Sequence, residues 1–275
     1  MNTGKLAGKV AIVSGSGRGI GRATAMKLAA EGACVVVNDM DSDPAHSAVE
    51  EIRKAGGTAV ACVGSVTADG FADRFVSAAY DEFGQMDIIV NNAGYTWDGV
   101  IQKMTDDQFD AMLDVHLRAP FRILRAAAGR WREAAKREAE QGHEVFRKVV
   151  NITSTSGTNG NAGQTNYAAG KAGIVGVTKA LAREWGRFKV NVNAVGFGYI
   201  VTRMTQTVEN APVTLDVDGR QLPAGIPARD VQRIEAAIPL GRGGTPEEAA
   251  GAVFLLCCPE ANYITGQVLM VTGGM

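Results

Sequence analysis

The stretch from Lys9 to Asp39 constrains the fold more than any other part of the sequence. It opens with the apolar, β-branched run KVAIVS, which is typical of a buried strand, and continues into the glycine-rich turn GSGRGIG. A helical pattern, RATAMKLAAEG, follows the turn, and a second apolar run, ACVVVND, ends at Asp39. This order of strand, glycine turn, helix, strand and acid predicts a βαβ unit that binds a dinucleotide.

The glycine turn and the acid each supply part of the predicted cofactor site. Glycines permit a tight turn and let backbone N–H groups approach a pyrophosphate at the start of the helix, where the helix dipole favours an anion. The carboxylate of Asp39 can accept hydrogen bonds from both hydroxyls of the adenosine ribose. The residues predicted to contact the cofactor in this unit are Gly15, Arg18, Gly19, Ile20, Gly21 and Asp39.

Strands and helices continue to alternate through the rest of the chain. Helices are predicted at 44–55, 68–83, 106–141, 166–185 and 246–258, with Pro120 and Gly129 interrupting the third. Further strands are predicted at 58–63, 87–90, 149–153, 190–195 and 268–271. This pattern predicts a Rossmann-type α/β fold, a doubly wound, mostly parallel sheet of seven strands with helices on both faces. We expect a single domain, 1–275, with an irregular substrate-loop insertion at about 199–239.

Charge and cysteine content argue against several classes of partner. The formal net charge is −1, so no global field favours nucleic acid or an anionic membrane surface. Cys34, Cys62, Cys257 and Cys258 form no C-x-x-C pattern and have no histidine cluster beside them, so we expect buried thiols, with neither a metal site nor a disulfide framework. Without an apolar signal segment or a long apolar run, the chain is expected in the cytoplasm.

The stretch from Asn151 to Lys171, NITSTSGTNGNAGQTNYAAGK, carries the predicted catalytic residues. Tyr167 and Lys171 lie one helical turn apart and so share a helix face. A nearby ammonium favours the phenolate and lowers a tyrosine pKa that is ordinarily about 10. Ser154, at the end of the preceding strand, can direct its hydroxyl into the same space. The pattern therefore predicts a tyrosine that acts as a general acid or base.

These motifs together resemble the short-chain dehydrogenase/reductase family, over nearly the whole chain. The resemblance rests on SGSGRGIG, on the NNAG that ends at Gly94, on Ser154 with Tyr167 and Lys171, and on NVNAVGFGYIVT after the sixth strand. It implies an NAD(P)-dependent oxidoreductase that transfers a hydride between a nicotinamide and a secondary alcohol or ketone.

The resemblance also implies roles for individual residues. Tyr167 would exchange a proton with the substrate oxygen, Ser154 would hydrogen-bond that oxygen, and Lys171 would hold the nicotinamide ribose. The further cofactor contacts that it implies are Val66, Asn92, Ala93, Gly94, Ile200 and Thr202.

The main departure from the family pattern is His116, in VHLRAP. The family has an asparagine there that anchors a water in the proton relay behind the lysine. His116 either joins such a relay or packs in its place, and we include it among the candidate catalytic residues. The sequence VHLR also occurs in family members that resemble the hydroxyacyl-CoA dehydrogenase part of peroxisomal multifunctional enzymes. These members also share the segment RMTQT, here Arg203–Thr207.

The cofactor signals conflict. Arg18 occupies a position that in some family members helps bind the 2′-phosphate of NADP, whereas the carboxylate of Asp39 would repel that phosphate. Because this repulsion outweighs one exposed arginine, NAD is the expected cofactor and NADP the less favoured one.

Three classes of function remain open. The first is oxidoreduction of a 3-hydroxyacyl or 3-oxoacyl thioester, on CoA or on an acyl carrier protein. A carrier protein would need a basic patch, to which Arg118, Arg122 and Arg125 could contribute. The second is a steroid or other secondary-alcohol dehydrogenase, and the third a cofactor-binding sensor without catalysis. The resemblance also implies a homotetramer.

Overall fold

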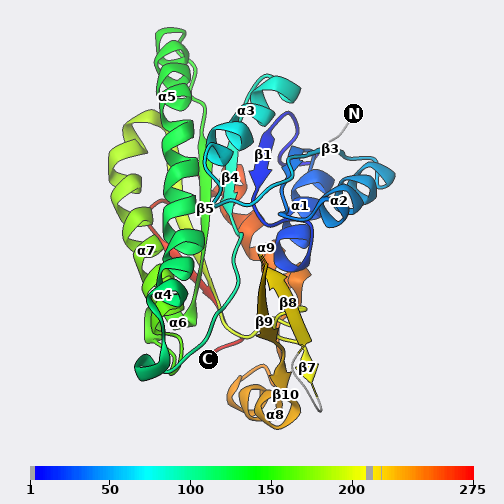
Figure 1. Cartoon of the computed structure of the whole chain (residues 1–275). Helices are drawn as coiled ribbons and strands as arrows, with labels where there is room; N and C mark the ends of the chain where they lie inside the picture. The colour runs from blue at the N-terminus through cyan, green and yellow to red at the C-terminus, as the bar shows by residue number, and fades with distance from the viewer. Residues whose placement is uncertain (1–3, 209–212, 218) are drawn as a thin grey trace.

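A seven-stranded parallel sheet forms the centre of the computed structural model, which describes residues 4–208, 213–217 and 219–275 (Figure 1). Its strands are β1 (Val10–Val13), β2 (Cys34–Val37), β3 (Thr58–Ala61), β4 (Ile88–Asn91), β5 (Arg147–Ser154), β6 (Val190–Phe197) and β11 (Val268–Val271). They lie in the order β11-β6-β5-β4-β1-β2-β3, and every neighbouring pair is parallel. The predicted fold class is therefore confirmed.

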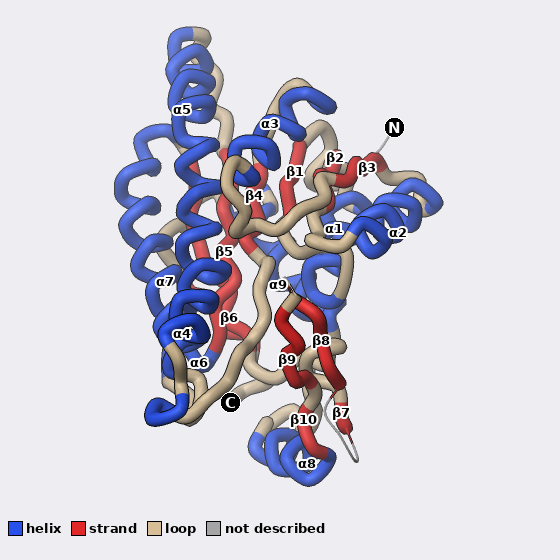
Figure 2. The backbone as a smooth tube through the Cα atoms, viewed as in Figure 1, coloured by secondary structure: helices blue, strands red, loops and turns tan. Residues whose placement is uncertain are grey.

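Helices cover both faces of the sheet (Figure 2). On one face α1 (Gly19–Ala30), α2 (Ser42–Lys54) and α9 (Pro246–Cys257) pack against the strands. On the other face lie α3 (Phe71–Phe83), α4 (Asp106–Leu113), α5 (Ala119–Glu140) and α7 (Thr165–Trp185). In the described part of the chain, no helix is long and apolar enough to cross a membrane. The four cysteines are free thiols, and Cys62, Cys257 and Cys258 are buried.

The central strands are buried because helices cover both of their faces. All four residues of β1, VAIV, are buried, and so are all eight residues of β6. The chain order reverses between β1 and β4, which are neighbours in the sheet. The loops that leave the carboxyl ends of these two strands turn to opposite sides, and open α/β sheets bind their ligands in the crevice that this creates.

The helical region from Asp106 differs from the prediction. Pro120 lies in the first turn of α5, directly after a π-helical segment, and cannot donate a helical hydrogen bond, whereas Gly129 lies inside α5 without interrupting it. The irregular stretch is a π-helical segment, Asp114–Arg118, between α4 and α5. Trp131, in the charged part of α5, is buried and donates from Nε1 to the carbonyl oxygen of Met86 at 2.9 Å.

The prediction that 199–239 is irregular was also wrong. This segment contains β7 (Thr207–Val208), β8 (Val213–Val217), β9 (Arg220–Ala224), β10 (Ile226–Pro227) and α8 (Ala228–Ala237). β8 and β9 form an antiparallel hairpin, and β7 pairs with β10. Figure 1 shows this unit as a layer of its own beyond the carboxyl edge of the main sheet, where it covers the mouth of the crevice. A short helix, α6 (Thr155–Asn159), follows β5 and packs against α7.

Candidate active site

A single cavity of about 720 Å³ lies at the carboxyl ends of the strands, between the sheet and the inserted segment. Every residue predicted from the sequence for cofactor binding or catalysis lines it. These are Gly15, Arg18, Gly19, Ile20, Gly21, Asp39, Val66, Asn92, Ala93, Gly94, His116, Ser154, Tyr167, Lys171, Ile200 and Thr202. The fold thus brings together residues at or after the ends of five strands, β1 to β5, with residues of the π-helical segment, of α7 and of the inserted segment.

The glycine turn after β1 packs directly against the loop after β4. Gly15 has φ +61°, and a Cβ there would lie 2.7 Å from the Cα of Ala93, so only glycine fits. The hydroxyl of Ser14 accepts from the backbone N–H groups of Asn92 and Ala93, each at 3.0 Å. The side chain of Asn92 donates in return to the carbonyl oxygens of Ser14 and Gly15. These bonds fix the two loops of the crevice relative to each other.

The start of α1 fits a dinucleotide pyrophosphate. The helix begins at Gly19, directly after the turn, and no side chain caps it. Its first N–H groups are therefore free to bind an anion, and the helix dipole favours negative charge there. Across the cavity Thr202 faces the turn: a Cβ on Gly19 would lie 3.8 Å from its methyl carbon.

Asp39 and Arg18 lie together in the cavity, beside the glycine turn. Asp39 is buried, and its Oδ1 accepts from the backbone N–H of Asp41 at 3.1 Å. The Arg18 guanidinium lies 2.8 Å from Oδ2 of Asp41 and 3.6 Å from Oδ1 of Asp39. Two carboxylates thus face the Arg18 guanidinium.

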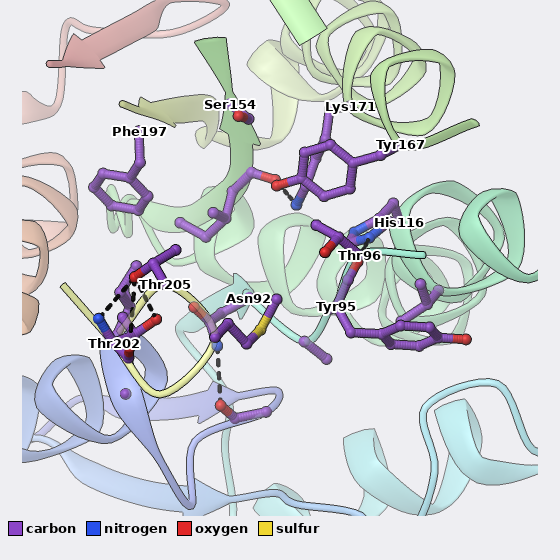
Figure 3. Close-up of a pocket in the computed structure, with 18 of the residues that line it drawn as sticks. Asn92, Tyr95, Thr96, His116, Ser154, Tyr167, Lys171, Phe197, Thr202 and Thr205 are labelled. Carbon is purple, nitrogen blue, oxygen red and sulfur yellow. Dashed lines mark hydrogen bonds between the residues drawn. The ribbon is translucent and has the colours of Figure 1, made fainter. Parts of the chain in front are cut away.

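Ser154, Tyr167 and Lys171 converge at the opposite end of the cavity (Figure 3). Ser154 is the last residue of β5 and precedes α6, so its hydroxyl lies at the strand's carboxyl end. Tyr167 lies in the first turn of α7, and the Nζ of Lys171 lies 5.6 Å from the centre of its ring. Lys171 is buried, and its Nζ donates to the carbonyl oxygen of Ile152 at 2.8 Å.

The expected lowering of the Tyr167 pKa by Lys171 was wrong for this structure. Burial raises the pKa of the Tyr167 phenol to about 12, although the Ser154 hydroxyl acts in the opposite direction. Burial also lowers the pKa of the Lys171 ammonium to about 7. Desolvation disfavours the charged form of both groups, and here it outweighs the attraction between ammonium and phenolate. Tyr167 is thus protonated at neutral pH.

His116 lies in the π-helical segment, next to Tyr167. Its ring contacts that of Tyr167 edge to face, with centroids 4.8 Å apart. Nε2 lies 2.7 Å from the carbonyl oxygen of Tyr95, to which it donates, while Nδ1 is buried and has no hydrogen-bond partner among the described residues. Burial and the nearby Lys171 hold the pKa of His116 well below its ordinary value, so the ring is neutral. A Cβ on Gly94 would lie 2.3 Å from the imidazole Cε1, so glycine there admits the ring.

Sequence reasoning missed several residues of the site. Asn38 accepts from the N–H of Gly15 and donates to the carbonyl oxygens of Cys62 and Gly64, which braces three loops. Its position at the end of a strand, next to Asp39, was a signal for this role. Asp41 and Gln164 were also missed. Asp41 pairs with Arg18, and Gln164 bonds to Asp98, both far away in the sequence, so no local pattern indicates these contacts.

Comparisons with known proteins agree with the fold and the site. A family model described as enoyl-(acyl carrier protein) reductase matches residues 15–275. A 3-oxoacyl-[acyl-carrier-protein] reductase from Synechocystis is 38% identical, with 98% of each chain covered. The hydroxyacyl-CoA dehydrogenase ChsB1 from Mycobacterium tuberculosis is 40% identical, over 99% of this chain and 80% of the relative. A solved short-chain dehydrogenase/reductase from Serratia marcescens matches with a TM-score of 0.82 and 31% identity, covering 98% of each chain.

Proposed function

Because the chain belongs to the short-chain dehydrogenase/reductase family, and is thus a nicotinamide-dependent oxidoreductase, we propose that it interconverts 3-hydroxyacyl and 3-oxoacyl thioesters, with NAD as cofactor. The convergence of Ser154, Tyr167 and Lys171 on one cavity with the glycine turn carries this proposal. The nicotinamide supplies or accepts the hydride, and the protein supplies orientation and proton transfer. In this reading all 275 residues form one domain, whose 199–239 segment is the substrate loop.

Tyr167 acts as the general acid in ketone reduction. Its high pKa keeps the phenol protonated at neutral pH, so the proton is available when the substrate oxygen gains charge. Ser154 donates a hydrogen bond to the same oxygen and stabilises that charge. Lys171, tied to the carbonyl oxygen of Ile152, holds the nicotinamide ribose.

We assign His116 a positioning role. Its lowered pKa disfavours the protonated imidazolium, so it is a poor proton acceptor. Its ring packs against the ring of Tyr167, and its Nε2 donates to the carbonyl oxygen of Tyr95 and so fixes that loop. The free lone pair of Nδ1 leaves one acceptor for a relay water. Replacement by asparagine should be tolerated if the relay water is all that matters.

The charges around Arg18 support NAD over NADP. A 2′-phosphate would need a free cation, but Arg18 already faces the carboxylates of Asp41 and Asp39. The buried Asp39 would in addition repel the phosphate, whereas it can accept hydrogen bonds from free ribose hydroxyls.

The thioester proposal rests on the relatives and on the shape of the site. Both relatives above are named for acyl substrates, and Val217, Leu222 and Met204 give the inserted segment an apolar inner surface. A CoA thioester is favoured over a carrier protein because two of the candidate docking arginines are engaged. Arg118 pairs with Asp114, and Arg122 donates to the carbonyl oxygen of Thr67 at 3.0 Å.

Initial rates with acetoacetyl-CoA, measured with NADH and with NADPH, test the proposal. We expect turnover with NADH, and a kcat/KM at least about tenfold lower with NADPH, since one unfavourable charge contact is worth a kcal/mol or more. A preference for NADPH would overturn the cofactor assignment. No turnover with either cofactor, alongside tight NADH binding, would favour a steroid or other secondary alcohol, or a sensor without catalysis.

Two further proposals concern the whole protein. A cytoplasmic location stays a prediction. The predicted homotetramer is supported by exposed apolar side chains on two separate surfaces, Phe121 on α5 and Leu255 with Leu269 on α9 and β11. Its test is the mass in solution.

A further inference from the structure

A polar network at the rim of the cavity has no part in the mechanism described above. Gln164 stands at its centre, directly before α7, and lines the cavity together with Ser156 and Asn161. Its Oε1 accepts from the Ser156 hydroxyl at 2.8 Å and from Nδ2 of Asn161 at 3.1 Å. Its Nε2 donates to Oδ2 of Asp98 at 3.0 Å.

This network fixes which way the Gln164 amide faces. The Asp98 carboxylate only accepts, so it requires the NH₂ end of the amide, while the Asn161 amide donates to the oxygen end. Both lone pairs of Oε1 are in use. The second N–H of Nε2 has no hydrogen-bond partner among the described residues. The Gln164 amide is therefore held in one orientation, and its second N–H can donate a hydrogen bond to a ligand.

The position of Gln164 relative to the reacting atoms suggests what it binds. It lies about one helical turn before Tyr167, at the same edge of the cavity. Ser154 and Tyr167 hold the oxygen on C3 of the substrate. A 3-oxoacyl thioester carries a second carbonyl on C1, one methylene away, which needs a hydrogen-bond donor when water is excluded.

We propose that Gln164 donates to the C1 carbonyl of the thioester and so makes the site selective for 3-oxoacyl thioesters over plain ketones. Asp98 and Ser156 position the amide for this contact. The inference rests on the proposed function and extends it, because it assigns the recognition of the thioester group to one residue. A simple ketone or a steroid alcohol offers no oxygen at the matching place and would leave the donor unpaired.

A pair of substrates that differ only at C1 tests the proposal. Acetoacetyl-CoA carries the C1 carbonyl, and the thioether 3-oxobutyl-CoA has a methylene in its place. Gln164→Met and Gln164→Leu both remove the donor and, unlike Gln164→Glu, place no second carboxylate against Asp98. Each variant should lower kcat/KM for acetoacetyl-CoA by about tenfold, the loss of one hydrogen bond, and leave kcat/KM for the thioether within about twofold.

A matched control is Gln85→Met, which removes a glutamine bonded to the carboxylate of Asp87 outside the cavity. It should change the rate with neither substrate, and the NADH dissociation constant should be unchanged in all variants. Equal losses on both substrates would show that Gln164 only supports the site and would overturn the inference. If the wild-type protein reduces neither compound, the proposed function fails with it.

Discussion

Tyr167 is held in its acid form by its surroundings. The partly buried ring of Tyr167 contacts the ring of His116 edge to face, and its centre lies 5.6 Å from the Nζ of Lys171. A Lys171 amine with a pKa of about 7 is only partly charged at neutral pH, which weakens its pull on the phenol proton. At pH 7 Tyr167 is therefore in the protonated form that ketone reduction requires. Alcohol oxidation requires the phenolate, which is only a small fraction at this pH.

This difference predicts opposite pH behaviour for the two directions. Oxidation of 3-hydroxybutyryl-CoA should speed up as pH rises from 7 to 9, because the phenolate fraction of Tyr167 grows while pH stays below the raised pKa. Reduction of acetoacetyl-CoA uses the protonated phenol and should gain nothing from the same change. The measurement is kcat/KM against pH in each direction. An oxidation rate that is level or falls over this range would contradict the raised pKa.

At the scale of single residues, the sequence predicted which residues line the cavity, but not the direction in which their pKa values are shifted. Tyr167, Lys171 and Asp39 stand in patterns whose spacing determines their placement. The direction of the Tyr167 pKa shift depends on how deeply the phenol is buried, which no local pattern records. The ion pair between Asp41 and Arg18 could not be predicted either, because it depends on how closely the two side chains approach in the fold.

The β8–β9 hairpin is the element that closes the cavity. Val217 and Leu222 pack against Tyr95 and Trp97, from the loop after β4. Arg220 adds a second attachment: its Nη2 lies 2.8 Å from Oδ1 of Asp107 in α4, and its guanidinium lies 5.3 Å from the centre of the Trp97 ring. Since exposed ion pairs and cation–π contacts are each worth about 1 kcal/mol or less, this attachment is reversible.

Removal of the Arg220 side chain should therefore loosen the hairpin without unfolding the protein. In Arg220→Ala, amide hydrogen exchange in β8 and β9 should be faster by up to about tenfold, the effect of roughly 1 kcal/mol, while exchange in β1 stays unchanged. Arg229→Ala is the matched control, because Arg229 is exposed on α8 and contacts only the neighbouring Asp230. If exchange in the hairpin is the same in both variants, Arg220 does not hold it.

The hairpin was missed although its signal is present in the sequence. The run VTLDVDGRQLPA alternates apolar and polar residues around an Asp-Gly pair, which is a strong local signal for a hairpin, and Gly219 has φ +78°. The π-helical segment at His116 could not be predicted in this way. It ends just before Pro120, whose missing N–H signals a break in the regular helix but not its π-helical form.

Across the whole molecule, the two edges of the sheet have separate roles. The cavity lies at the carboxyl edge, where the alternation of parallel strands and helices predicted the ligand site. The amino edge holds Lys148, a buried cation at the start of β5 whose Nζ donates to Oδ1 of Asn191 at 2.8 Å and to Oδ1 of Asn262 at 2.7 Å. Burial lowers the pKa of this ammonium to about 8, with Lys9 acting in the same direction and the thiols of Cys257 and Cys258 against it.

This buried cation should make stability depend on pH in the alkaline range. Between pH 8 and about 10.4, the unfolded chain holds a proton on Lys148 that the folded chain has released, so this group makes the free energy of unfolding rise with pH. Lys148→Met lacks the effect. The difference in urea midpoint between wild type and variant should shift in favour of the wild type as pH rises from 8 to 10. A difference that stays constant would contradict the lowered pKa.

The central claim is that Tyr167 transfers the proton in a site that otherwise only binds. Tyr167→Phe keeps the ring that packs on His116 and removes only the hydroxyl. We expect kcat for acetoacetyl-CoA reduction with NADH to fall by at least about 100-fold, with the NADH dissociation constant within about twofold of wild type. Tyr80→Phe, on the distant helix α3, should change neither value. Wild-type turnover by Tyr167→Phe would contradict the account, because another group would then have to supply the proton.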